Sequence, residues 1–408
     1  MKQSERRIMI IPGAKAQLAL AEKCRDIGYK IVCVDPNEDA PVLVMADYKE
    51  IGDILDRDLC EKVARKYGVE AVISDECDIA MPTIGHVSDK LGLPSIGTRM
   101  ASLYTNKYEM RKFCQTHHFP TPGFKKCGSV REAEDFFVSL PVGKMIIKPL
   151  DSNSSRGVYT ISDVGEIGKY FHDAIAFSKV DKAVLCEEYI EGTEFTVDGL
   201  VVNGKHKSLA ISEKKHYEYN NNIACELFFS TYNPDFSYDT LRKQNDKYVD
   251  KTGLPFGFTH AEYKYDGKKF VLIEIGARGG GNYISSHIVP ALYGIDYYQM
   301  LLDSTFGRRL NEISEIPLDT EKCAVLKFFD VERDGCMVAG VENTNILAND
   351  PDVLLYEFKF KNNDIVHKAT NDSARVGFYI AKKNSRKEME RFMEYINEKV
   401  RIRFVETD

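Results

Sequence analysis

The chain has 408 residues, of which 43% are hydrophobic and 29% charged, and this is enough for two or three globular domains. The formal net charge is −7, and lysines and acids are interspersed, so no basic block suggests nucleic acid as a partner. No apolar stretch is long enough for a secretory core or a membrane span, and the ten cysteines form no CxxC pair. We therefore expect a cytoplasmic protein without a membrane partner, whose cysteines are buried or free thiols.

Residues 1–105 alternate short apolar runs with helical patterns. RIMIIPG, YKIVCVDPN and VEAVISDE are typical of strands, whereas KAQLALAEKCRDIG and DLCEKVARKYG are typical of helices closed by glycine. This alternation predicts an α/β domain with a parallel sheet, in which ligands lie beyond the carboxyl ends of the strands, near Gly13, Asp35 and Glu76. The first turn, PGAKAQ, lacks G-x-G-x-x-G, so NAD binding is disfavoured, and Asp35 is either a ribose ligand or a turn former before Pro36.

A second domain is expected over residues 106–310, beginning where Asn106 caps a new helix. Residues 123–200 mix β runs with one long helix around 163–178. Residues 199–275 favour antiparallel strands, with a polar insertion at 213–226 that is a candidate lid. A helix from about Pro290 to Phe306 follows, and residues 311–408 are expected to form a mixed α and β region that ends in the helix RKEMERFMEYINEKV.

Two β runs flank Asp266-Gly267, a hairpin signal, and each run has one acid, Glu262 or Glu274. A two-residue loop would place these acids on opposite faces. A three-residue loop over 266–268 would pair Glu262 with Leu272 and Glu274 with His260, so that both acids share a face, and a bulge would serve equally. Converging carboxylates fit a divalent ion such as Mg²⁺, which prefers oxygen ligands, although separate ion pairs with Lys264 or Arg278 would also explain them.

Two further segments are candidates for binding a nucleotide. In KMIIKPLDSNSSRGVYTI, Lys148 ends an apolar strand, and a polar turn follows whose backbone N–H groups and hydroxyls suit phosphate oxygens, although any hairpin can have a serine-rich turn. In AVLCEEYIEGTEFTVDG, two β runs flank a short linker with an apolar slot and carboxylates, which suits adenine and ribose but also suits solubility.

Taken in order, these segments resemble the ATP-grasp superfamily, in particular carboxylate–amine ligases similar to biotin carboxylase, D-alanine–D-alanine ligase and the carbamoyl-phosphate synthase large chain. TNKYEMRKFCQTHHFPTP, MIIKPLDSNSSRGV, VLCEEYIEGTEFTVD and AEYKYDGKKFVLIEIGARGGG resemble successive family motifs. The resemblance implies an N-terminal pre-ATP-grasp domain, an ATP-grasp domain with a mobile subdomain over 122–195, and a closing domain. Gly276 departs from the family, which often has asparagine there, and DSNSSRG is poorer in glycine than usual.

The resemblance also implies roles for individual residues. ATP is expected to contact Lys107, Lys148, Ser154, Ser155, Arg156, Gly157, Glu187, Glu188, Tyr189, Ile190 and Glu194. The metal ligands are expected to be Glu262 and Glu274, and the catalytic residues to be Arg278, Lys215 and Gly280. Substrate candidates are Gly13, Glu76, Gly281, Asn282 and Arg375. The adjacent Lys214 is an alternative to Lys215, and His260 and His287 are candidates either for amine deprotonation or for structural hydrogen bonds.

The implied reaction uses ATP and Mg²⁺, with Mn²⁺ as an alternative metal, to phosphorylate a small, amino-acid-like carboxylate. An amine then attacks the acyl phosphate, and ADP and phosphate are released. Rival hypotheses are a carboxylase, a kinase with a stable phosphorylated product, or a nucleotide-binding regulatory module without turnover. A homodimer is one arrangement found among relatives. The sequence does not identify the acid or the amine.

Overall fold

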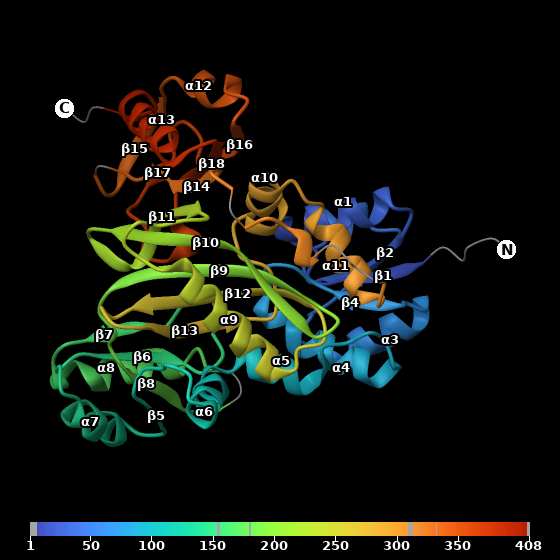
Figure 1. Ribbon diagram of the computed structural model, residues 1–408, viewed down its shortest axis with the longest axis horizontal. Coiled ribbons are helices and arrows are strands. Elements are labelled where there is room, and N and C mark those ends of the chain that lie inside the picture. Colours follow the sequence, from blue (N-terminus) through green and yellow to red (C-terminus); the bar gives the residue numbers. More distant parts are fainter. Residues whose placement is uncertain are drawn as a thin grey trace.

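The computed structural model describes residues 6–152, 156–178, 181–308, 313–318, 320–331 and 333–405. Figure 1 shows a large central sheet, with the N-terminal domain to its right, a small subdomain below it and the C-terminal region above it. Within these described ranges, no helix is long and apolar enough to cross a membrane.

The N-terminal domain has a parallel sheet, as the alternating pattern predicts, and it contains four strands in the order β3-β2-β1-β4, one more than the three strand-like runs seen in the sequence. Its strands are β1 (Arg7–Ile10), β2 (Lys30–Asp35), β3 (Tyr48–Ile51) and β4 (Ala71–Ile73). The surrounding helices are η1 (Lys15–Gln17), α1 (Leu18–Asp26), α2 (Pro41–Met45), α3 (Arg57–Tyr67), η2 (Asp78–Ala80), α4 (Met81–Leu91) and α5 (Gly97–Thr105). The loop after β4 contacts the segment that follows β13, where Asp75 accepts from the Gly279 N–H.

The small subdomain is an antiparallel sheet in the order β5-β8-β6-β7, covered by two helices. Its elements are β5 (Phe124–Cys127), α7 (Val130–Ser139), β6 (Met145–Pro149), β7 (Tyr159–Ile161), η3 (Val164–Glu166), α8 (Ile167–Ile175) and β8 (Val184–Glu188). The helix predicted around 163–178 is present as η3 followed directly by α8, over 164–175. That helix is shorter, and α7 was missed although Ser129 caps it by accepting from the Glu132 N–H.

The central sheet has eight antiparallel strands in the order β13-β12-β9-β10-β11-β14-β18-β16. Its elements are β9 (Thr193–Val202), β10 (Lys205–Tyr217), β11 (Asn220–Ser230), α9 (Tyr238–Thr252), β12 (Gly257–Tyr265), β13 (Phe270–Gly276), β14 (Cys323–Phe328), β16 (Val353–Phe358) and β18 (Gly377–Lys383). The polar insertion lies mostly within β10 and β11, which only residues 218–219 join. Strands β14, β18 and β16 continue the sheet into the C-terminal region.

The helix predicted from Pro290 to Phe306 is two helices, and this prediction was wrong in its continuity. A π-helical turn, η4 (Ile284–Ile288), leads into α10 (Val289–Tyr293), and Gly294 at φ +69° ends it before α11 (Tyr297–Thr305). The remaining elements are η5 (Ile313–Glu315), β15 (Cys336–Val341), α12 (Thr344–Asn349), β17 (Ile365–Val366), η6 (Asp372–Ala374), α13 (Arg386–Lys399) and β19 (Ile402–Phe404). Strands β17, β15 and β19 form a third, small sheet.

Helix α6 (Lys107–His117) links the N-terminal domain to the small subdomain. As predicted, Asn106 caps it: its Oδ1 atom accepts from the N–H groups of Tyr108 at 3.0 Å and Glu109 at 3.2 Å. The Lys107 N–H donates to the Leu150 carbonyl, which joins the start of α6 to the end of β6. The cap therefore fixes the position of the first helical residue, Lys107.

We expect Asn106→Ala to cost about 1 kcal/mol of stability, because two N–H groups lose their acceptor. The urea midpoint of unfolding, followed by circular dichroism, measures this loss. Ser129→Ala, which removes the single cap bond of α7, is the matched control and should cost a similar or smaller amount. An unchanged midpoint in Asn106→Ala would contradict the cap.

Candidate active site

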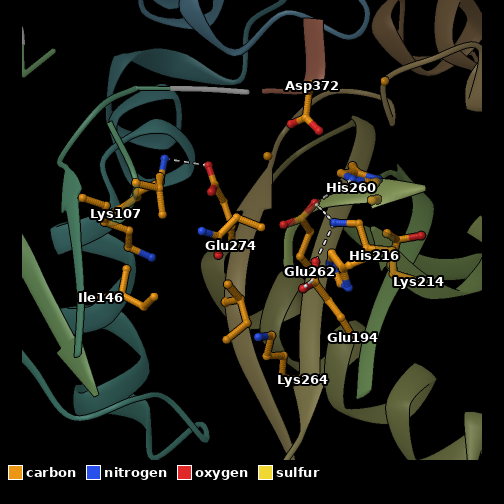
Figure 2. A pocket seen from close by; sticks show the side chains of 18 of the residues that line it. Lys107, Ile146, Glu194, Lys214, His216, His260, Glu262, Lys264, Glu274 and Asp372 are labelled. Carbon is orange, nitrogen blue, oxygen red and sulfur yellow. Dashed lines mark hydrogen bonds and ion pairs between the residues drawn. The ribbon is translucent and has the colours of Figure 1, made fainter. Parts of the chain in front are cut away.

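Two glutamates face each other at the centre of the site, on adjacent strands of the central sheet. Glu262 on β12 is the direct partner of Glu274 on β13. Of the alternatives that the sequence left open, the structure has the bulge and not the diagonal register of a three-residue loop: residues 266–269 connect Tyr265 to Phe270, and a one-residue shift between Glu262 and Tyr263 leaves Ile273 unpaired. Without that bulge, Glu262 would face Ile273, and Glu274 would point to the other side of the sheet. The prediction that both acids share a face is confirmed, and Figure 2 shows their side chains side by side.

Two lysines from other elements compensate this pair of carboxylates. Lys107 Nζ lies 2.8 Å from Glu274 Oε1, and Lys214 Nζ on β10 lies 2.8 Å from Glu262 Oε1 and 2.5 Å from Glu194 Oε1 (Figure 2). Burial alone would raise the pKa of Glu262, but Lys214 and His260 outweigh it and hold this pKa well below its usual range. Glu262 is therefore ionised at neutral pH.

A buried charge cluster fixes a third lysine of the cleft, Lys148. Glu187 on β8 lies between Lys148 Nζ and Arg111 Nε, at 2.6 Å from each. Burial lowers the pKa of Lys148 and Glu187 opposes that shift, while the same two cations keep the Glu187 pKa low against its own burial. Arg111 also donates to the carbonyl of Ile273, the bulge residue, at 2.5 Å. One buried guanidinium thus connects the Lys148 strand to the strand of Glu274.

An apolar slot lies beside these charges. Ile146, Tyr189, Ile190 and Ile273 line it, and Lys264 Nζ lies 5.0 Å from the Tyr189 ring centroid. The Glu188 backbone N–H donates to Gly123, so the linker is held at its start. A flat, partly apolar slot next to lysines and ionised carboxylates suits a purine with its polyphosphate.

The opposite end of the cleft contains two arginine–carboxylate pairs. Arg278 binds Asp78 through Nε at 3.0 Å and Nη2 at 2.8 Å, and Arg375 pairs with Asp372 while lying over the Phe328 ring at 3.9 Å. Glu76 also lines this end. Its carboxylate accepts from the Tyr283 N–H at 2.9 Å, and burial raises its pKa well above the usual range. The whole cleft has a volume of about 310 Å³.

The glycines at positions 279–281 are placed differently from their prediction, which made Gly280 catalytic and Gly281 a substrate contact. Gly279 donates its N–H to Asp75 at 3.1 Å, so that donor is already used. A Cβ atom on Gly280 would lie 2.4 Å from Asp198 Oδ1, so this glycine permits packing, and it does not line the cleft. Only Gly281 of the three lines the cleft, and it has open space where a Cβ would be.

Most of the predicted site residues come together in this cleft. The cleft is lined by Glu76, Lys107, Lys148, Glu187, Glu188, Tyr189, Ile190, Glu194, Glu262, Glu274, Arg278, Gly281, Asn282 and Arg375. The predictions for Ser154 and Ser155 lie outside the described residues. Arg156 and Gly157 do not line the cleft, and Gly157 packs against Phe177 and Pro149 at φ +74°. Gly13 does not line the cleft either. Its N–H donates to Asp35, which also accepts from the Asn37 N–H and so serves as a turn former.

Lys215 is placed differently from its prediction. Successive side chains of a strand point to opposite faces, so only one of Lys214 and Lys215 can face the cleft. Lys214 does so, whereas Lys215 is 61% exposed and pairs with Glu226 outside it. His260 lines the cleft and pairs with Asp198 at 2.9 Å, whereas His287 bonds Ser286 and lies outside.

Sequence reasoning missed several residues of the cleft. Asp78 and Arg111 are far along the chain from their partners, Arg278 and Glu187. The available signals were only their positions, in the acidic SDECD loop and four residues after Lys107. His216 lies 3.3 Å from Glu194 and belongs to the same strand face as Lys214. Asp372 could not be identified from the sequence, because its place in the cleft depends on how the C-terminal region packs against the rest of the chain.

The site fits a metal ion held jointly by protein and ligand. Among the described residues, no group of three or more histidine, cysteine or acidic side chains could hold a metal by itself. Glu262 and Glu274 supply two oxygens on one side, which is the usual protein share of an Mg²⁺ site that is completed by phosphates and water.

Comparison with known proteins connects this geometry to a family. Residues 141–286 match the model of the ATP-grasp domain. The chain is 26% identical over 180 residues to dapdiamide A synthase of Enterobacter agglomerans, covering 43% of this chain and 42% of that protein. It is 29% identical over 117 residues to D-alanine–D-alanine ligase of Marinobacter nauticus, covering 28% of this chain and 35% of that protein. Both alignments therefore span less than half of the relative's length.

Solved structures match the fold along nearly the whole chain. L-amino acid ligase from Bacillus licheniformis has a TM-score of 0.80 at 17% identity, with 98% of this chain and 99% of that chain covered. Phosphoribosylglycinamide synthetase from Anaerococcus prevotii has a TM-score of 0.75 at 19% identity, with 98% and 100% covered. The fold class predicted from the sequence is confirmed, and the similarity at this level of identity concerns the fold.

We expect Lys214→Met to weaken binding of MgATP about 10- to 100-fold, because a charge-assisted contact is lost and two ionised acids remain unbalanced. Isothermal titration with MgATP measures this. Lys215→Met, the adjacent lysine on the outer face, is the matched control and should bind as the unsubstituted chain does. Equal losses in both variants would contradict the assignment of the inner face.

Proposed function

We propose, from the premise that the chain contains an ATP-grasp domain, that it is an ATP-dependent carboxylate–amine ligase that releases ADP and phosphate. The observation that supports this most directly is the pairing of Glu262 with Glu274 between Lys107 and Lys214, in a cleft that also has Lys148. The acids complement the metal ion of a metal-bound polyphosphate, and the lysines around them complement its phosphate groups.

ATP is proposed to lie with its adenine in the slot between Ile146 and Ile273 and its ribose near Glu194. Lys107 and Lys148 would neutralise phosphate oxygens as point charges. Glu262 and Glu274 would hold Mg²⁺, which, when bound, withdraws charge from the transferred phosphoryl group. Because phosphoryl transfer needs little covalent help from the protein, these residues act by positioning and by balancing charge.

The acceptor carboxylate is proposed to bind at Arg278. The guanidinium lies beyond the metal acids and lines the cleft, so a carboxylate in contact with it would face the terminal phosphate. The product of this first step is an acyl phosphate, whose carbonyl carbon the amine attacks while phosphate leaves. Arg278 would remain in contact with the phosphoryl oxygens during both steps, which lowers the cost of their negative charge.

The electrostatics of the far end favour amino-acid-like substrates. Glu76 is a half-buried acid whose described hydrogen bonds come from backbone N–H groups, so an ammonium group there would supply a charged partner. Arg375, on the C-terminal side, suits a second carboxylate. A substrate with a carboxylate at Arg278 and an ammonium group at Glu76 is a zwitterion, which describes an α-amino acid.

We expect Glu262→Gln and Glu274→Gln each to reduce Mg²⁺-dependent ADP formation at least about 100-fold, because each removes the negative charge of a metal ligand and one ion pair of its lysine. Initial rates from a coupled ADP assay measure this. Glu218→Gln, in the turn between β10 and β11, is the control and should keep the original rate. Unchanged rates in both cleft variants would contradict the metal assignment.

The choice of reaction is tested by a substrate screen. Amino acids and other small carboxylates are supplied singly and with amines, and ADP, phosphate and coupled products are measured by enzymatic assay and mass spectrometry. A ligase gives free phosphate and a product containing both substrates only when carboxylate and amine are present together. A stable phosphorylated product from one substrate would instead indicate a kinase, and no ADP with any pair would indicate a binding module.

A further inference from the structure

Arg278 is held by a carboxylate from a different domain. Asp78, at the start of η2 in the N-terminal domain, is 200 residues earlier in the chain and binds both Nε and Nη2 of Arg278. The two side chains are only 15% and 16% exposed. Such a bidentate pair fixes the plane of the guanidinium, whereas a single contact would leave it free to rotate.

Gly276 provides the room for this pair. A Cβ atom on Gly276 would lie 2.8 Å from Asp78 Oδ1 and 3.2 Å from Arg278 Nε. The first distance is shorter than real Cβ contacts, so any side chain at position 276 would displace the Asp78 carboxylate. The position that ends β13 is therefore empty of a side chain because a carboxylate from the N-terminal domain occupies that space.

The same N-terminal loop holds the segment that follows Arg278. Asp75 Oδ1 accepts from the Gly279 N–H at 3.1 Å, and Asp75 Oδ2 accepts from the Tyr298 hydroxyl at 2.8 Å. Glu76 Oε1 accepts from the Tyr283 N–H at 2.9 Å. Three acids within four residues thus contact the segment 278–283, and Asp78 is the one that contacts the side chain with a proposed role in the reaction.

We propose that Asp78 is a positioning residue for Arg278, and that Gly276 is required because it leaves space for Asp78. This inference rests on the proposed function, since Arg278 is there assigned to the acceptor carboxylate and the transferred phosphoryl group. Arg278 Nη1 also donates to the Gly279 carbonyl at 2.9 Å, and the guanidinium, oriented by Asp78, lines the cleft. The N-terminal domain thereby takes part in the chemical step and not only in substrate binding.

The test compares Asp78→Ala, Gly276→Ala and the double variant in carboxylate-dependent ADP release. Asp78→Ala should lower kcat about 10- to 100-fold, because a small displacement of a catalytic group has an effect of this size. Gly276→Ala should lower kcat by a comparable factor through the displaced carboxylate. The double variant should be no slower than Asp78→Ala alone, because the added Cβ then meets no carboxylate.

Three comparisons separate positioning from a loss of folding. KM for ATP should stay unchanged in all three variants, because none touches the slot or the lysines. Asp89→Ala is the matched control, since Asp89 also holds a loop of the N-terminal domain, by accepting from Thr98 at 2.8 Å, away from the cleft. It should lower the unfolding temperature and leave kcat unchanged. Asp78→Asn, which keeps the shape and one acceptor, should recover part of the lost rate.

A second readout does not depend on activity. The unfolding temperatures of Asp78→Ala, Arg278→Ala and their double variant should show non-additive losses, because the two residues share one contact. Additive losses would overturn the pairing, and losses of kcat that multiply in the Asp78→Ala/Gly276→Ala variant would overturn the role of Gly276. An unchanged kcat in Asp78→Ala would overturn the positioning role alone, whereas no carboxylate-dependent ADP release from the unsubstituted chain would overturn the ligase function.

Discussion

The pairing of β12 with β13, shifted by one residue at Ile273, is the constraint on which the rest of the cleft depends. It puts two carboxylates directly opposite each other, where like charges destabilise the pair of strands unless cations lie nearby. Those cations come from two other elements, Lys107 from α6 and Lys214 from β10. The hairpin, strand β10 and the linking helix α6 must therefore all be in place before the acids are tolerated, and this requirement connects folding to the assembly of the site.

The same arrangement explains why the cleft suits a metal–polyphosphate better than either component alone. Lys107 and Lys214 are each paired with acids that would bind metal or ribose, at 2.5 to 2.8 Å, and Lys148 is paired with Glu187 at 2.6 Å. A free polyphosphate would bind the lysines but leave the acids without partners, and a free cation would do the reverse. A metal–polyphosphate replaces both sets of partners together, so the desolvation of buried charge is offset on both sides.

The sequence predicted features that depend on contacts within short segments, and it missed features that depend on contacts between distant segments of the chain. The helix cap at Asn106 and the parallel sheet of the first domain follow from patterns within short segments, and both predictions were correct. The side of β10 that faces inward depends on its register with β9, so the choice between Lys214 and Lys215 could not be made from their adjacent positions. The bulge at Ile273 depends on a carbonyl contact with Arg111 on another element, and no local pattern reports it.

Gly276 is an example of a residue whose local interpretation changes once a long-range contact is known. Taken locally, a glycine after the second acid is a departure from the family pattern, which suggests a weakened metal site. In three dimensions the space is filled, because Asp78 from the N-terminal domain occupies it and holds Arg278. The glycine at position 276 and the carboxylate 198 residues earlier therefore fit together, because a side chain at 276 would crowd Asp78 and the absence of Asp78 would leave Arg278 without this support. A departure from a local rule at a functional site is thus compensated by a partner elsewhere in the chain.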